Sequence, residues 1–117
     1  MINPLEHDEQ KAFVRWFRLQ YSNTLIFAIP NGGDRHPRVA QKLKAEGVVK
    51  GVPDLFIPEW RLWVEMKRRK GSYLSQDQKA VKEQLEQAGY AYIVGKGAED
   101  AAEQVKEFRL NNVCKKC

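Results

Sequence analysis

Two carboxylates and one lysine stand where they could act together. Asp54 begins a short apolar run, and Glu65 and Lys67 end the next one, with Pro58-Glu59-Trp60-Arg61 between the runs. If the runs pair as an antiparallel hairpin centred on that connection, Asp54 faces Glu65, and opposed Cβ atoms lie about 4.5–5.5 Å apart. Carboxylates this close repel one another unless a cation lies between them. The pattern therefore predicts a divalent metal site.

The period of two in the second strand separates its residues into two faces. The predicted core face carries Leu62, Val64 and Met66, and the other carries Trp63, Glu65 and Lys67. A carboxylate and an ammonium two residues apart lie roughly 6–7 Å from one another, so both could reach one phosphate. Hard oxygen ligands suit Mg²⁺ or Mn²⁺, which favours phosphodiester hydrolysis. The alternative is an exposed hairpin on which Glu65 and Lys67 are ordinary solvated charges.

The elements that must position these residues alternate between helix and strand. Turn residues, caps and periodicity predict helices over 3–21, 37–46, 75–88 and 98–110, and strands over 24–29, 54–57, 62–67 and 90–94. The order α-β-α-β-β-α-β-α predicts the α/β class, with a mixed central β-sheet flanked by helices. Since there is no repeat or linker-like stretch, we expect one domain over 1–117.

The first predicted helix carries acidic residues where apolar ones are expected. Its apolar stripe consists of Leu5, Ala12, Phe13, Trp16 and Phe17. Glu6 and Glu9 fall inside this stripe instead of opposite it. A capping box opened by Asn3 is a structural alternative for Glu6.

Five ordered blocks of the chain resemble a known nuclease family. The blocks are Ile29-Pro30-Asn31-Gly32-Gly33, Leu43-Lys44-Ala45-Glu46-Gly47, Gly51-Val52-Pro53-Asp54-Leu55, Glu65-Met66-Lys67 and Leu74-Ser75-Gln76-Asp77-Gln78. The proline-Asp, spacer and Glu-x-Lys arrangement is similar to that of PD-(D/E)XK nucleases. Within them the chain resembles the VRR-NUC group, particularly its small stand-alone phage and bacterial members. A bare Glu-x-Lys is weak, whereas five ordered blocks over nearly the whole chain are specific.

The resemblance implies a PD-(D/E)XK core and a set of site residues. Asp54 and Glu65 would bind Mg²⁺ or Mn²⁺, with the backbone carbonyl of Met66 as a further ligand, and Lys67 would assist the attack on the phosphate. The resemblance also implies a glutamine on the helix after the Glu-x-Lys strand, a position that Gln78 matches.

An acidic residue on the first helix is also implied by the resemblance. Glu6 fits the family's Glu-x-x-x-Gln pattern with Gln10, and Glu9 is its competitor on the same stripe. We prefer Glu6 as the further metal ligand.

Basic residues suggest where a nucleic acid would bind. The net charge of +5 and the isoelectric point near 9.3 are compatible with a polyanionic partner. Arg68, Arg69 and Lys70 follow the Glu-x-Lys strand and would most simply contact DNA phosphates. Asn31 and Arg35, in a glycine-rich stretch, could cradle another phosphate. The alternatives are a solvated loop and a plain turn.

Other residues carry weaker patterns. Cys114 and Cys117 have the spacing of half a zinc site, but we prefer two reduced thiols on a frayed tail, with a zinc site shared between two chains as the alternative. Trp60 is expected either as an exposed wedge near DNA or in a subunit interface, and a place in the monomer core is the alternative. His36 has no identified partner and is left out of the site.

No apolar run could span a bilayer, and the polar, acidic start of the chain is unlike a signal peptide, so we expect a cytoplasmic protein.

These patterns together lead to a functional hypothesis. We expect a Mg²⁺- or Mn²⁺-dependent, structure-selective DNA endonuclease that acts as a homodimer on four-way (Holliday) junctions or other branched DNA, as in DNA repair, in a bacterial or phage-infected cell. One alternative is a DNA-binding module that has lost its chemistry. Another is a restriction-type endonuclease, because a shared core does not fix the substrate.

Overall fold

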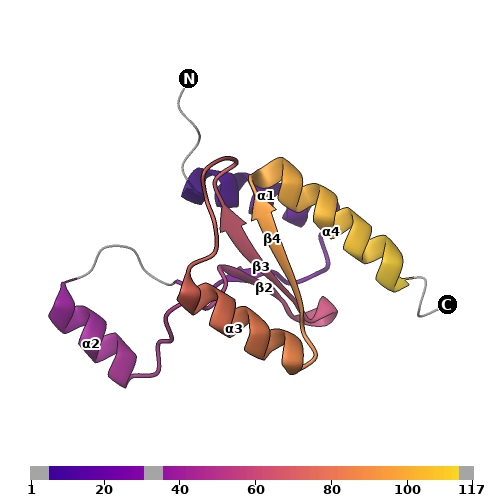
Figure 1. Ribbon diagram of the computed structural model, residues 1–117. Coiled ribbons are helices and arrows are strands. Elements are labelled where there is room, and N and C mark those ends of the chain that lie inside the picture. Colours follow the sequence, from indigo (N-terminus) through magenta and orange to yellow (C-terminus); the bar gives the residue numbers. More distant parts are fainter. Residues whose placement is uncertain (1–5, 31–35, 114–117) are drawn as a thin grey trace.

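A four-stranded sheet lies at the centre of the fold (Figure 1). The structure is a computed structural model, and it describes residues 6–30 and 36–113. The strands lie side by side in the order β1 (Phe27–Ala28), β2 (Leu55–Ile57), β3 (Leu62–Lys67) and β4 (Ala91–Lys96). β2 is antiparallel to both β1 and β3, whereas β3 and β4 are parallel. The predicted mixed sheet of the α/β class is confirmed.

Helices cover both faces of this sheet. They are α1 (Glu6–Gln20), α2 (Pro37–Ala45), α3 (Gln76–Gln87) and α4 (Ala98–Val113). Figure 1 shows α1 and α4 together on one face, α3 on the other, and α2 away from the sheet. Parallel strands need a crossover connection, and α3 supplies the one between β3 and β4. The predicted order of helices and strands is confirmed.

The hairpin of β2 and β3 has the predicted register. Leu55 pairs with Val64, Phe56 with Trp63 and Ile57 with Leu62. A short 3₁₀ turn, η1 (Pro58–Trp60), and the left-handed Arg61 (φ 49°) make the connection. The register, continued by one residue, places Asp54 opposite Glu65.

Both faces of β3 are buried. Leu62, Val64 and Met66 are completely buried against α1 and α4, as predicted for the core face. Glu65 and Lys67, on the opposite face, are only 2% and 8% exposed. The alternative that these two residues are ordinary solvated charges is therefore wrong.

Two expectations about apolar residues also need correction. Trp60 is buried and packs its ring against Phe17, Tyr21 and Phe108, because η1 folds the hairpin tip back onto α1 and α4. It is neither an exposed wedge nor an interface residue. Ala12, which was assigned to the apolar stripe of the first helix, is exposed.

The first strand is shorter than predicted. Instead of 24–29, β1 contains only Phe27 and Ala28, the two residues that pair with Phe56 and Leu55 of β2. Its other side is an edge of the sheet.

Candidate active site

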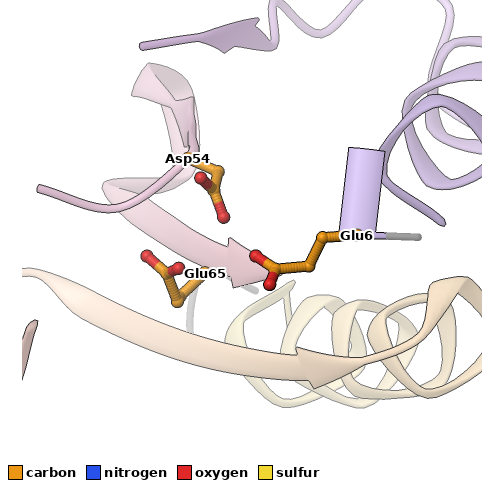
Figure 2. A group of neighbouring side chains, drawn as sticks. All are labelled: Glu6, Asp54 and Glu65. Atoms are coloured by element: carbon orange, nitrogen blue, oxygen red, sulfur yellow. The ribbon is translucent and has the colours of Figure 1, made fainter. Parts of the chain in front are cut away.

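Three carboxylates from distant parts of the sequence meet at one end of the hairpin. Glu6, Asp54 and Glu65 each offer an oxygen, and these oxygens lie within 4.8 Å of one another. Figure 2 shows the side chains pointing toward one another from the first turn of α1, from the residue before β2 and from β3. The Asp54–Glu65 pairing predicted from the hairpin is present, and Glu6 adds a third carboxylate.

Asp54 is held by its backbone and its side chain. The amide of Ile29 donates to its carbonyl oxygen at 2.8 Å, which extends the β1–β2 pairing by one residue. The amide of Met66 donates to Oδ2, also at 2.8 Å. These two bonds fix Asp54 beside β3.

Glu65 lies in an environment that opposes its negative charge. Its Oε2 accepts a hydrogen bond from Nε2 of Gln78 at 3.1 Å, and its buried Oε1 has no hydrogen-bond partner among the described residues. Burial and the nearby Asp54 raise the pKa of Glu65 to about 9, although Lys67 acts in the opposite direction. A buried carboxylate with an unused oxygen needs a positive partner in order to ionise.

Gln78 is positioned by the start of α3. Ser75 caps this helix and forms a capping box with Gln78, in which each side chain binds the other residue's backbone amide. The oxygen of the Gln78 amide is thereby occupied, which turns its NH₂ group toward Glu65. The structure places Gln78 at the site, as the resemblance implied.

Lys67 lies at the end of β3 on the same face as Glu65. Its side chain is buried, and its carbonyl accepts a hydrogen bond from the amide of Gly97 at 2.9 Å. It forms no ion pair with a carboxylate in the described part of the chain. The buried ammonium therefore lies beside the carboxylates without being neutralised by one of them.

The two acidic candidates on α1 have different surroundings. Glu6 belongs to the carboxylate cluster, whereas Glu9 is buried one turn later and accepts hydrogen bonds from Nε of Arg69 at 2.7 Å and from the amide of Ala98 at 3.0 Å. Burial alone would raise the pKa of Glu9, but these two donors lower it below its ordinary value. Glu9 is thus a structural clamp that joins α1 to α4 and to the segment after β3.

The remaining predicted contacts with DNA are placed in part. Arg68 and Lys70 are exposed beside the site, while the guanidinium of Arg69 is bound by Glu9. Asn31 and Arg35, like Cys114 and Cys117, lie outside the described residues. His36 lies away from the site, and its Nδ1 caps α2 by accepting from the amide of Arg38.

Tyr92 is a neighbour of the site that the sequence did not reveal. It lies on β4 opposite Trp63, and its buried hydroxyl has no hydrogen-bond partner among the described residues. Burial raises its pKa, and the charges of Glu65 and Asp54 raise it further. Alternation along β4 could have suggested which face Tyr92 lies on. Its neighbours on β3 could not be predicted, because no short turn sets the parallel register of the two strands.

The donor set fits a hard divalent cation. Three carboxylates converge, one of their oxygens is buried without a partner, and no arginine or lysine forms an ion pair with any of them within the described ranges. Oxygen-rich sites of this kind suit Mg²⁺ or Mn²⁺. Glu6, Asp54 and Glu65 are the side chains that could hold the ion.

Comparisons with known proteins agree with this arrangement. A solved structure described as a "VRR_NUC domain protein" superposes with a TM-score of 0.76 and 25% sequence identity, over 92% of this chain and 90% of that chain. No family model matches the sequence, and no curated protein does. The similarity therefore comes from the three-dimensional structure.

Proposed function

We propose that this chain, which folds as a VRR-NUC domain, is a Mg²⁺- or Mn²⁺-dependent DNA endonuclease that cuts four-way junctions or other branched DNA. The similarity to the VRR-NUC structure supports a nuclease domain. The observation that carries the metal-dependent chemistry is the convergence of Glu6, Asp54 and Glu65 beside the buried Lys67.

The side chains have separate roles in this proposal. Glu6, Asp54 and Glu65 would hold the ion, together with the backbone carbonyl of Met66. When bound, the ion acts as a Lewis acid that offsets negative charge on the phosphate and lowers the pKa of the attacking water. Lys67 orients the attacking water or stabilises negative charge that develops on the phosphate. Gln78 donates to Oε2 of Glu65 and so keeps this carboxylate turned toward the cluster.

Positive side chains around this centre would hold the DNA. Arg68 and Lys70 are exposed directly after β3, and we assign them, with Arg69, to phosphate contacts. For Asn31 and Arg35, which lie outside the described residues, a phosphate contact remains a prediction from the sequence. Arg69 would contact phosphate only through the part of its guanidinium that Glu9 leaves open, since its side chain is half exposed.

In the residues that the structure describes, no helix is both long and apolar enough to cross a bilayer.

A cleavage assay tests the proposal. Linear duplex, flap and four-way junction DNA would be incubated with the protein and either Mg²⁺, Mn²⁺ or a chelator. We expect junction cleavage with either metal, none in chelator, and a loss of about a hundredfold or more for Glu65→Gln and Lys67→Met. Lys106→Met on α4, which removes an exposed lysine instead, is the matched control.

Circular dichroism and a gel-shift assay would accompany cleavage. If the variants keep the fold and bind DNA, loss of cutting locates the chemistry in these residues. Near-wild-type turnover by either variant, or full activity in chelator, would refute the mechanism. A protein that binds DNA and cuts none of the substrates would instead be the inactive binding module.

A further inference from the structure

The face of the sheet that α3 covers carries most of the buried polar atoms that lack a partner (Figure 1). In the described residues, four buried side-chain nitrogen or oxygen atoms have no hydrogen-bond partner. Three of them belong to this face: Nε1 of Trp63, Oε1 of Glu65 and the hydroxyl oxygen of Tyr92. Buried polar groups are nearly always paired, so each exception needs an explanation. Three unpaired atoms on one face indicate that this face is built to receive a polar ligand.

Tyr92 is a diagonal neighbour of Glu65 on this face. It pairs with Trp63 across the parallel strands β3 and β4, and Glu65 is the next residue of β3 on the same side. Diagonal neighbours on one face of a sheet lie roughly 7–8 Å apart, within reach of an aromatic and a long side chain. Burial raises the pKa of Tyr92, and the charges of Glu65 and then of Asp54 raise it further. Both carboxylates lie on the β3 side of Tyr92, which indicates that its hydroxyl is directed toward the carboxylate cluster.

Two residues of α3, one turn apart, lie over Glu65 and Tyr92. Nε2 of Gln78 donates to Oε2 of Glu65 at 3.1 Å. Nζ of Lys82 lies 5.4 Å from the centre of the Tyr92 ring, and this ammonium is itself paired with Glu86. The ring of Tyr92 is thus held under the same stripe of α3 that positions Glu65.

The carboxylate of Glu65 offers more acceptor positions than the protein fills. An ionised carboxylate has about four acceptor positions on its two oxygens. Among the described residues, Gln78 is the only hydrogen-bond donor to Glu65, and the Tyr92 hydroxyl is a donor without any partner. Carboxylates that bind metals are themselves hydrogen-bonded by surrounding groups, which orient them.

We propose that Tyr92 is a positioning residue of the metal site, whose hydroxyl donates to Oε1 of Glu65 and orients this carboxylate toward a bound ion. Since both atoms are unpartnered in the described part of the chain, the bond forms when Glu65 turns to bind the ion. Gln78 on α3 and Tyr92 on β4 then fix the two oxygens of Glu65. The inference rests on the proposed nuclease function and deepens it, because it adds a residue that acts on the metal through Glu65.

Two phenylalanine substitutions test the inference through metal binding, without requiring cleavage. Tyr92→Phe removes the hydroxyl and keeps the ring beneath Lys82. Tyr90→Phe is the matched control, because it removes the hydroxyl of a tyrosine whose ring lies against Arg61 instead. Titration calorimetry with Mn²⁺ should give an affinity about tenfold or more lower for Tyr92→Phe, as is typical when a group that orients a metal ligand is lost. Tyr90→Phe should bind Mn²⁺ as the wild type does.

Thermal unfolding in chelator separates positioning from packing. Because the Tyr92 hydroxyl has no protein partner to lose, Tyr92→Phe should unfold in chelator at the wild-type temperature or above it. At a fixed, saturating concentration of Mn²⁺, the unfolding temperature should then rise less for Tyr92→Phe than for the wild type. A purely structural role of the hydroxyl would lower the unfolding temperature in chelator and leave the Mn²⁺ affinity unchanged.

The possible outcomes distinguish this inference from the proposed function. The inference is overturned if Tyr92→Phe binds Mn²⁺ like the wild type, if both variants lose affinity equally, or if Tyr92→Phe is less stable than the wild type in chelator. A wild type that binds Mn²⁺ with the help of Tyr92 but cuts no DNA would support the inference and fail the proposed function alone. A wild type that cuts DNA, with a Tyr92→Phe variant that binds Mn²⁺ normally, would fail the inference alone. A wild type that binds no Mn²⁺ would refute both.

Discussion

Glu65 shows how one residue can be both costly to the fold and useful to the site. A carboxylate that is 2% exposed and faces Asp54 is stable without its charge, and its raised pKa expresses that preference. Polar groups placed in such environments are candidates for function, because a bound ligand can relieve the cost. The same reasoning does not apply to Glu9, whose charge is already satisfied by Arg69 and Ala98.

The pKa of Glu65 predicts an unusual pH dependence of stability in the metal-free protein. Its folded-state pKa of about 9 lies above the ordinary 4.5, so between these values the folded state binds more protons than the unfolded state. The free energy of unfolding should therefore fall as pH rises through this window. Glu65→Gln, which cannot ionise, should lack this fall when thermal unfolding is followed in chelator.

Metal binding provides the complementary measurement. Mn²⁺ must displace the proton of Glu65, so its affinity for the wild type should increase with pH up to about 9. Titration calorimetry in buffers of different ionisation enthalpy would detect the released proton. A parallel pH slope of stability in wild type and Glu65→Gln would contradict the account.

Part of the site could be predicted from the sequence. Residues joined by a short connection could be placed, and residues joined by long ones could not. Asp54 and Glu65 are joined by a tight hairpin, so counting from the turn fixed their register correctly. Glu6 approaches them only when α1 packs on the sheet, and the local sequence does not determine that packing. Its assignment to the site came from the family resemblance. Tyr92 was missed because β3 and β4 are joined by a long crossover through α3.

At the scale of elements, the start of α3 is held against the segment that precedes β2. Gly51 has a φ of +95°, and a Cβ added there would lie 2.6 Å from the backbone carbonyl of Asp77 and 2.9 Å from the amide nitrogen of Gln78. The absent side chain thus allows α3 to bring Gln78 to Glu65. Gly47 has a similar φ of +105°, but a Cβ there would meet open space.

This pair of glycines makes a matched test. Gly51→Ala should displace the start of α3, reduce stability by about 1–3 kcal/mol and weaken Mn²⁺ binding, because Gln78 withdraws from Glu65. Gly47→Ala should show only the backbone strain, of about 1 kcal/mol, and bind Mn²⁺ normally. Denaturant unfolding and calorimetry measure the two quantities. Equal effects of both substitutions on metal binding would show that contact with α3 does not matter.

The Glu9 clamp carries a second prediction about elements. Glu9→Gln should lower the free energy of unfolding by about 1–3 kcal/mol at neutral pH, since a buried hydrogen bond to a charged group is lost. Because the pKa of Glu9 is lowered in the folded state, this stabilisation is present above the ordinary pKa and is lost as pH falls through the folded value. The difference from wild type should therefore shrink in acid.

An exposed ion pair supplies the control for the clamp. Glu103→Gln removes the partner of Lys106 on α4, where both side chains are largely exposed, and should change stability by less than about 1 kcal/mol. Denaturant melts at several pH values compare the two variants. A Glu9→Gln protein as stable as Glu103→Gln at neutral pH would show that the clamp is dispensable.

At the scale of the whole molecule, the sequence predicted the order of elements better than their extents. Helices α1, α3 and α4 were found from their periodicity and caps, and each packs on the sheet. The length of the edge strand β1 was overestimated, since β propensity alone does not show which residues pair, and only Phe27 and Ala28 pair with β2. The expectation of one domain over 1–117 remains a prediction.

The final prediction concerns assembly and substrate together. The described residues contain one carboxylate cluster, so symmetric incision of both strands of a junction requires two chains, and a two-fold dimer is the commonest way to supply them. Trp60 is excluded from the interface by its burial, which leaves exposed apolar residues of α4, such as Leu110 at 69% exposure, as candidates for the dimer interface.

Light scattering should give a mass near twice 13.5 kDa, and Leu110→Glu should shift the measured mass toward that of the monomer. The dimer should cut a four-way junction in preference to linear duplex of the same sequence. A stable monomer that degrades linear duplex equally well would contradict both the assembly and the substrate.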